Sequence, residues 1–163
     1  MNFDRALLET YRALLQTTDL QRSYQEFVRL FRWLHTELQR RLPDFRFQGG
    51  ICENAMEYAY FSFSSPELRK EGLKLVAVFV HSDFRLEVWL SGVNRAAQCR
   101  WARRLPPCPP PVEAAADPAR RDWLARLPVE TDLSDGTAAA TAMEAAVREL
   151  LRFFAAAGRA GEF

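Results

Sequence analysis

The chain has no apolar run that approaches the roughly 20 residues a membrane-spanning helix needs. Its N-terminal stretch, MNFDRALLETYRALL, contains an acid and lacks a continuous apolar segment, so we expect no secretory signal. Cysteine occurs three times, an odd number without close pairing, which argues against a disulfide framework. We therefore expect a cytoplasmic protein with no membrane partner.

Motifs for common catalytic chemistry are also lacking. Two histidines and three scattered cysteines give no metal-ligand spacing, and no Gly-rich phosphate loop or G-x-S-x-G elbow occurs. A nuclease-like fold would need Glu-x-Lys on a strand, but the candidate strand reads Glu87-Val88-Trp89. We expect no metal site and no cofactor.

What is present is the composition of one globular domain. Of the 163 residues, 48% are hydrophobic and 26% are charged. A chain of this length can bury a core without disulfide bonds or metal ions, so we expect a single domain over 1–163. The formal net charge is +1, which gives no overall attraction to nucleic acid. Arginine supplies nearly all the positive charge, since lysine occurs only at Lys70 and Lys74, as a GC-rich bacterial genome would explain.

Two amphipathic helices are predicted at the N-terminal end. In 3–16, leucines and a tyrosine recur at spacings of three and four residues. A broader apolar stripe follows over 20–42 and ends before Pro43. Because the second stripe is broad, we expect that helix to lie on a sheet, with His35 packed in its apolar side.

The middle of the chain predicts an α+β fold, with a mostly antiparallel sheet of about five strands covered by helices. The element order is α-α-β-β-β-β-α-β-α. Pro128 indicates an edge position for the last strand. The predicted strands are 45–51, 55–64, 73–81, 84–91 and 121–130. Two further helices are predicted over 92–105, with Ser91 as a cap, and over 137–157. We also expect an insertion loop over about 105–118 and a frayed tail over 158–163.

The hairpin around Ser82 and Asp83 separates two kinds of face. If these two residues form the loop, Phe79 opposes Leu86 on an apolar face that should meet the helices. The opposite face carries three valines beside Arg85, Glu87 and Trp89, a mixture that suits a half-covered concave surface.

Candidate ligand-binding residues are those that this mixed face would bring together. Aromatic rings and guanidinium groups bind planar or anionic ligands, or form protein interfaces. The structural alternatives are solvated charges, a packed tryptophan and a helix cap. The candidate set is Tyr58, Tyr60, Arg85, Glu87, Trp89, Asn94, Arg95 and Gln98.

The segments YAYFSF and LKLVAVFVHSDFRLEVWLSGVNRAAQ resemble an uncharacterised bacterial family, a domain of unknown function. Its pattern has a Tyr-Phe-Ser-Phe strand and a block of the form VFxHxxxRFEVWLxGxNRxxQ. This chain has Leu86 where the pattern has Phe, and Glu57 where it has Asp. The resemblance covers about 40 residues and implies no activity. It does imply that His81, Arg85, Glu87, Trp89, Asn94, Arg95 and Gln98 belong together.

Three hypotheses follow, of which we favour a non-catalytic module that binds a small ligand or a protein through the face built by 58–98. The alternative is an enzyme with Glu87 or His81 as general acid or base in the same cleft. The third is nucleic-acid binding, through Arg100, Arg103 and Arg104 after Arg95, or a degenerate nuclease-like fold. Cations are favourable at the end of a helix for structural reasons alone, which argues against a nucleic-acid role for these arginines. A homodimer is compatible with the sequence.

Overall fold

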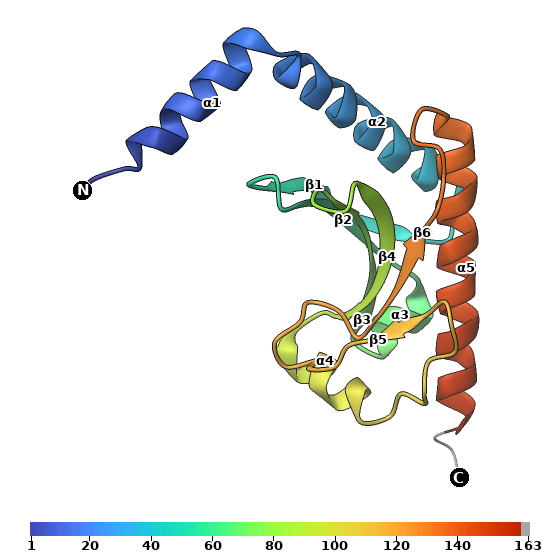
Figure 1. Cartoon of the computed structure of the whole chain (residues 1–163). Coiled ribbons are helices and arrows are strands. Elements are labelled where there is room, and N and C mark those ends of the chain that lie inside the picture. The colour runs from blue at the N-terminus through green and yellow to red at the C-terminus, as the bar shows by residue number, and fades with distance from the viewer. Residues whose placement is uncertain (161–163) are drawn as a thin grey trace.

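The computed structural model describes residues 1–160, and the side chains of residues 1–157. Within this range the chain forms five helices and six strands, which confirms the α+β class and the predicted element order, with the short elements α3 and β5 in addition (Figure 1). The bounds are α1 Arg5–Thr17, α2 Leu20–Arg41, β1 Arg46–Asn54, β2 Tyr58–Ser64, α3 Pro66–Lys70, β3 Leu73–Val80, β4 Arg85–Gly92, α4 Arg95–Ala102, β5 Glu113–Ala114, β6 Ala125–Val129 and α5 Gly136–Ala160.

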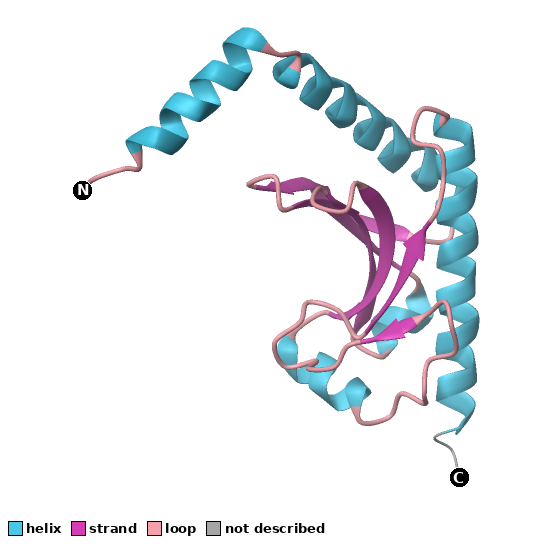
Figure 2. Ribbon diagram, in the orientation of Figure 1, coloured by secondary structure: helices cyan, strands magenta, loops and turns pink. Residues whose placement is uncertain are grey.

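The strands form one curved antiparallel sheet in the order β1-β2-β3-β4-β6-β5 (Figure 2). β5 lies inside the segment 105–118, which is rich in proline and which we expected to be an insertion loop without a strand, so that expectation was wrong. β6 is consequently not the outermost strand. However, β5 pairs with only Ala125 and Arg126, so in the described sheet Pro128 has no partner strand on that side and needs no amide hydrogen there.

The β3–β4 hairpin has the predicted register. Phe79 pairs with Leu86 and Ala77 with Val88, and the Phe84 amide donates to the His81 carbonyl oxygen at 3.2 Å across the turn. Because strand side chains alternate between faces, this register also fixes which residues share each face.

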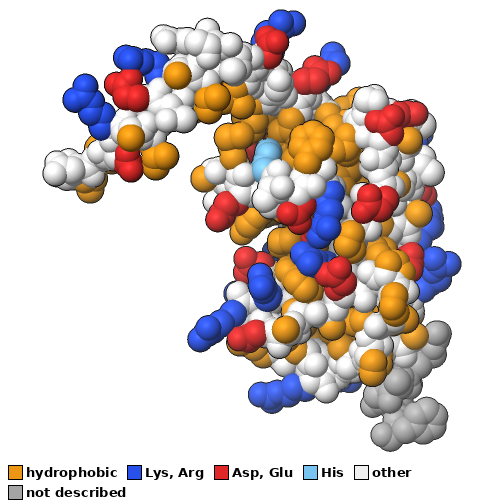
Figure 3. Space-filling model, in the orientation of Figure 1, with side chains coloured by type: hydrophobic (Ala, Val, Ile, Leu, Met, Phe, Trp, Pro, Cys, Tyr) orange, Lys and Arg blue, Asp and Glu red, His pale blue; other side chains and the backbone are white. Residues whose placement is uncertain are grey.

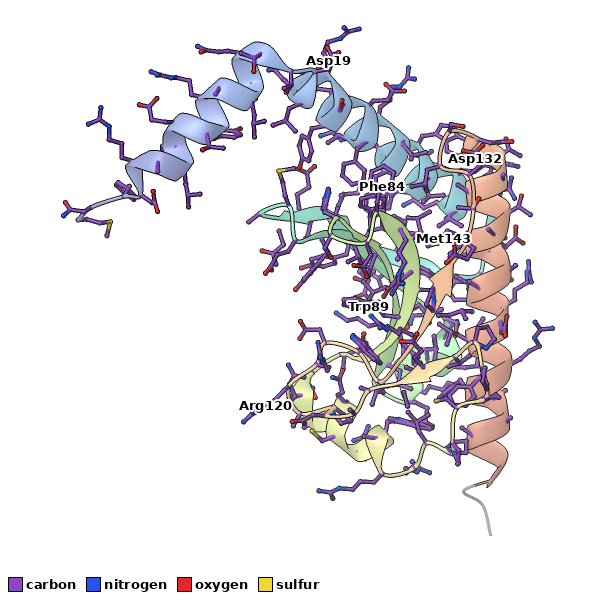
Figure 4. All side chains as sticks on the ribbon, in the orientation of Figure 1. Asp19, Phe84, Trp89, Arg120, Asp132 and Met143 are labelled. Atoms are coloured by element: carbon purple, nitrogen blue, oxygen red, sulfur yellow. The ribbon has the colours of Figure 1, made fainter. Side chains whose placement is uncertain are left out.

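The main core lies between the convex side of the sheet and two helices, α2 and α5 (Figure 1). The broad stripe of α2 rests on the sheet as predicted, with Phe31, Leu34 and Leu38 buried. From α5, Met143 points into the same layer (Figure 4). His35 packs against the rings of Phe47 and Phe61, as expected of a histidine in an apolar stripe.

Three predicted boundaries shift for local reasons. β2 begins at Tyr58 rather than at 55, because Ala55 and Met56 take positive φ angles in the hairpin turn. α4 is capped by Asn94, whose Oδ1 accepts from the Ala97 amide at 2.8 Å, and not by Ser91. The predicted tail begins inside α5, which continues to Ala160; its remainder, 161–163, lies outside the described residues.

α1 differs from the other long helices because none of its residues is buried. It leaves α2 at a sharp bend near Asp19 and extends away from the sheet (Figure 1). The concave side of the sheet therefore remains open beneath it.

Candidate functional site

The concave face of the sheet carries a second, smaller apolar cluster. Val76 and Trp89 are paired across β3 and β4, and both are largely buried. The Trp89 ring lies 5.9 Å from that of Tyr58 and 6.4 Å from that of Trp123. Figure 4 shows Trp89 on the hollow side of the sheet, away from α5. This face is the half-covered concave surface that the strand pattern predicts.

A pocket of about 420 Å³ opens on this face, within the size range of small-molecule sites. Strands β2, β3 and β4 form its floor, and the start of α4 and the loop before Trp123 form its wall. The lining residues are Tyr58, Tyr60, Lys74, Val76, Trp89, Ser91, Gly92, Asn94, Arg95, Gln98 and Asp122. Six of the eight candidate residues line it; the other two, Arg85 and Glu87, lie on the same strand face beyond Trp89.

Glu87 is a buried carboxylate whose hydrogen-bonding capacity is filled by neighbours. Its side chain is 0% exposed, and Arg85 donates to Oε1 from Nε at 2.8 Å and from Nη2 at 2.6 Å. The indole Nε1 of Trp89 donates to Oε2 at 2.6 Å, and Arg126 Nη1 lies 3.5 Å from both oxygens. A buried charge needs such partners. Glu87 therefore anchors the floor of the pocket, and the geometry gives it no free lone pair for a substrate proton.

His81 lies on the opposite face from Glu87, so the expectation that both border one cleft was wrong. Its ring packs 4.8 Å from Phe27 and 5.0 Å from Phe79, under α2. Burial lowers the pKa of His81, and the nearby Glu53 carboxylate opposes that effect. Side chains along a strand point alternately to the two faces of the sheet. His81 comes two residues after Phe79, whose side chain is in the main core, so His81 points to that face and away from Glu87.

Gln98 and Arg95 hold the loop that forms the pocket wall. Gln98 Nε2 donates to the carbonyl oxygens of Pro118 at 2.9 Å and Arg121 at 2.5 Å, and its Oε1 accepts from the Gly92 amide at 3.1 Å. Arg95 donates to the same two carbonyl oxygens. These polar groups are thus engaged within the chain, and they contribute to the site by fixing the loop.

Gly92 permits this arrangement because β4 and α4 approach closely there. A Cβ atom at Gly92 would lie 2.5 Å from the amide nitrogen of Gln98 and 2.7 Å from the carbonyl oxygen of Asn94. Both neighbours are backbone atoms, which cannot swing aside. The Gly-x-Asn-Arg part of the sequence pattern is therefore a packing requirement of the β4–α4 corner.

Lys74 is a lining residue that the sequence analysis missed. It pairs with Ser91 at the end of the hairpin, and among the described side chains it makes no ion pair or hydrogen bond. The other cation of the lining, Arg95, is 3.2 Å from the Asp122 carboxylate, so these two charges offset each other. The net charge of the lining is therefore positive. The alternation of side chains along the strand could have identified it, because Lys74 lies two residues before Val76 and therefore on the same face of the sheet.

Tyr60 adds a hydroxyl group to the floor of the pocket and lies opposite Cys52 in the β1–β2 ladder. A hydrogen bond with the Cys52 thiol, followed by burial, raises the pKa of Tyr60. Because this bond raises the pKa, the phenol is its donor, and the Tyr60 oxygen is left to accept a hydrogen bond from a ligand.

Two of the three arginines considered for nucleic-acid contact make contacts within the chain. Arg100 Nη2 donates to the Glu71 carbonyl oxygen at 3.1 Å, and the Arg104 guanidinium lies 4.9 Å above the Trp101 ring.

In the part of the chain that the structure describes, no group of three or more His, Cys, Asp or Glu side chains could hold a metal ion.

Comparison with known proteins identifies the family. A family model described as a domain of unknown function (DUF7000) matches residues 4–155, so the chain belongs to this family. The resemblance to an uncharacterised domain family is thereby confirmed. No curated protein and no solved structure matches the chain. Across residues 1–160, no helix has the length and apolar character needed to cross a membrane.

Proposed function

We propose that the concave pocket binds a small organic anion that has a flat apolar part. The observation that carries this proposal is the pairing of an aromatic surface with a cation that has no partner among the described side chains. Trp89 and Tyr58 supply flat rings, and Lys74 supplies the charge. Small-ligand sites combine an apolar surface with polar groups that fix the orientation of the ligand, and the lining of this pocket contains both.

The charge and burial of the site favour an anion over a cation. Lys74 has no carboxylate partner, whereas the Asp122 carboxylate pairs with Arg95 and Glu87 is enclosed beneath Trp89. A ligand carboxylate or phosphate would give Lys74 a charge-assisted hydrogen bond.

We also propose that residues 1–163 form a single domain in the cytoplasm of a bacterium. The continuity of the sheet supports one domain, because strands from 46 to 129 share it. The three free cysteines fit a reducing compartment. The strong preference for arginine over lysine fits a GC-rich genome.

A thermal-shift panel with charge-matched probes tests the binding proposal. The pairs are benzoate with benzamide and adenosine monophosphate with adenosine, so that each anion has a neutral analogue. A ligand at 100 times its dissociation constant adds about 2.7 kcal/mol, or roughly 5–10 °C for a domain of this size. We expect one anion to raise the melting temperature more than its neutral analogue does.

The two lysines of the chain provide a matched pair of variants. Lys74→Met removes the pocket cation, and Lys70→Met removes an exposed cation on α3. We expect the anion-dependent shift to vanish in Lys74→Met and to persist in Lys70→Met. Equal shifts in both variants, or no shift with any anion, would overturn the proposal.

A further inference from the structure

α1 presents an apolar stripe that no other part of the described chain covers. Leu7 is 67% exposed and Tyr11 55%, although residues of this kind are normally buried. Figure 3 shows hydrophobic atoms along the side of α1 that faces the hollow. The exposed members on α1 are Leu7, Leu8, Tyr11, Leu14 and Leu15, and Phe3 just before the helix is exposed as well.

A helix of this length needs a covering surface to be stable. α1 has 13 residues, none of them buried, and isolated helices shorter than about 12–15 residues are marginal in water. Its Asp4 cap, which accepts from the Leu7 amide at 3.1 Å, stabilises only the first turn. The amphipathic pattern therefore indicates that the apolar side packs on something outside the described chain.

The size of the stripe matches what two copies of this chain need to associate. From typical side-chain areas, the exposed apolar part is on the order of 500 Å² per protomer. Two such surfaces give on the order of 1,000 Å², which is the lower bound for a specific protein interface. A two-fold axis would bring the same surface of each copy together, as in most homodimers.

The charges of α1 favour a second copy over a membrane surface. Helices that lie on anionic membranes carry an excess of Lys and Arg, whereas Arg5 and Arg12 are offset by Asp4 and Glu9. Glu9 pairs with Arg12 within the helix at 2.5 Å. In an antiparallel pair centred on Tyr11, Leu7 lies opposite Leu15 and Leu8 opposite Leu14, so the apolar stripe is complementary to itself.

We propose that α1 is a dimerisation helix whose apolar face packs, antiparallel, on α1 of a second copy of this chain. The bend near Asp19 holds α1 away from the sheet, so that the helix can reach a partner without disturbing the core. This proposal is independent of the ligand, because none of its residues lines the pocket.

Sedimentation velocity on the full chain, from about 1 to 100 µM, tests this proposal with two neighbouring substitutions. Leu14→Glu places a charge in the stripe, and Ala13→Glu places the same charge on the opposite side of the helix. We expect wild type and Ala13→Glu to form a dimer. We expect the dimer dissociation constant of Leu14→Glu to be at least about thirtyfold higher than that of wild type, because a two-fold symmetric interface contains the substituted residue twice.

Hydrogen exchange over residues 5–17 gives a second measurement on the same samples. The α1 amides should be protected in the dimeric proteins and should exchange quickly in Leu14→Glu, while the β3 and β4 amides stay protected in all three. A monomeric wild type across the concentration range would overturn the proposal. So would equal dimerisation of both variants, or binding of wild type to neutral vesicles through α1.

Discussion

The indole Nε1 of Trp89 donates a 2.6 Å hydrogen bond to the carboxylate of Glu87, two residues earlier on the same face of β4. This bond ties the aromatic floor of the pocket to a buried charge. Arg85 and Arg126 neutralise that charge from either side, so the floor is fixed before any ligand arrives. The binding that we propose for the concave face depends on this rigid floor.

Replacement of Glu87 should therefore destabilise the protein. Glu87→Gln removes the charge that pairs with two arginines, and we expect a loss of about 2–4 kcal/mol in the free energy of unfolding. Urea denaturation measures this loss. Glu113→Gln is the matched control, because Glu113 contacts the same Arg126 at 2.7 Å but is 48% exposed, so its loss should stay below about 1 kcal/mol. Equal losses would contradict the role of Glu87 as a buried anchor.

Gln98→Ala should release the loop of the pocket wall. The substitution leaves the carbonyl oxygens of Pro118 and Arg121 without their Gln98 donor, at a cost of about 1–3 kcal/mol. We expect trypsin to cleave after Arg120 or Arg121 faster than in wild type. The exposed Gln48→Ala serves as the control and should leave the cleavage rate unchanged.

Gly92→Ala should be among the most damaging single substitutions, because its new Cβ would overlap backbone atoms of α4. We expect a loss of about 3 kcal/mol or more in the free energy of unfolding. Gly50→Ala has open space around the new methyl group and should lie within about 0.5 kcal/mol of wild type. Similar stabilities of the two variants would contradict the close approach of β4 and α4.

The stability of the protein should decrease as the pH falls below about 6.5. Burial lowers the pKa of His35, and in the same direction that of His81, from the ordinary value of 6.5. Between the lowered and the ordinary value the unfolded chain binds more protons, so the free energy of unfolding rises with pH across that window. NMR titration of the two ring signals, assigned with His35→Gln, should give both pKa values below 6.5. A His35 value at or above 6.5 would refute the packed, neutral ring.

The sequence predicts those features that depend on neighbours close along the chain. The stripe of α2, the Ser82–Asp83 hairpin and the mixed face with Trp89 all follow from periodicity, and the structure confirms them. The functions of Arg95 and Gln98 were harder to predict, because their partners are backbone carbonyl oxygens 20 or more residues later in an irregular loop. No local pattern encodes such a contact.

β5 and Lys74 were missed for related reasons. A two-residue strand beside a run of prolines has no periodicity, and it forms only because β6 offers an open edge. Lys74 looks like an ordinary exposed charge at the start of a strand. It becomes a site residue only when α4 and the loop before Trp123 close one side of the concave face.

The most direct test of binding over Trp89 is a ¹H–¹⁵N spectrum of the four tryptophan indoles during titration with the anion that stabilises the protein most. Trp89 lines the pocket and Trp123 packs beside it, whereas Trp33 lies on α2 and Trp101 on α4 contacts Phe154. Our account predicts saturable shifts for the Trp89 and Trp123 signals, lost in Lys74→Met, with those of Trp33 and Trp101 unchanged. Shifts confined to Trp33 or Trp101, or equal shifts in Lys74→Met, would contradict it.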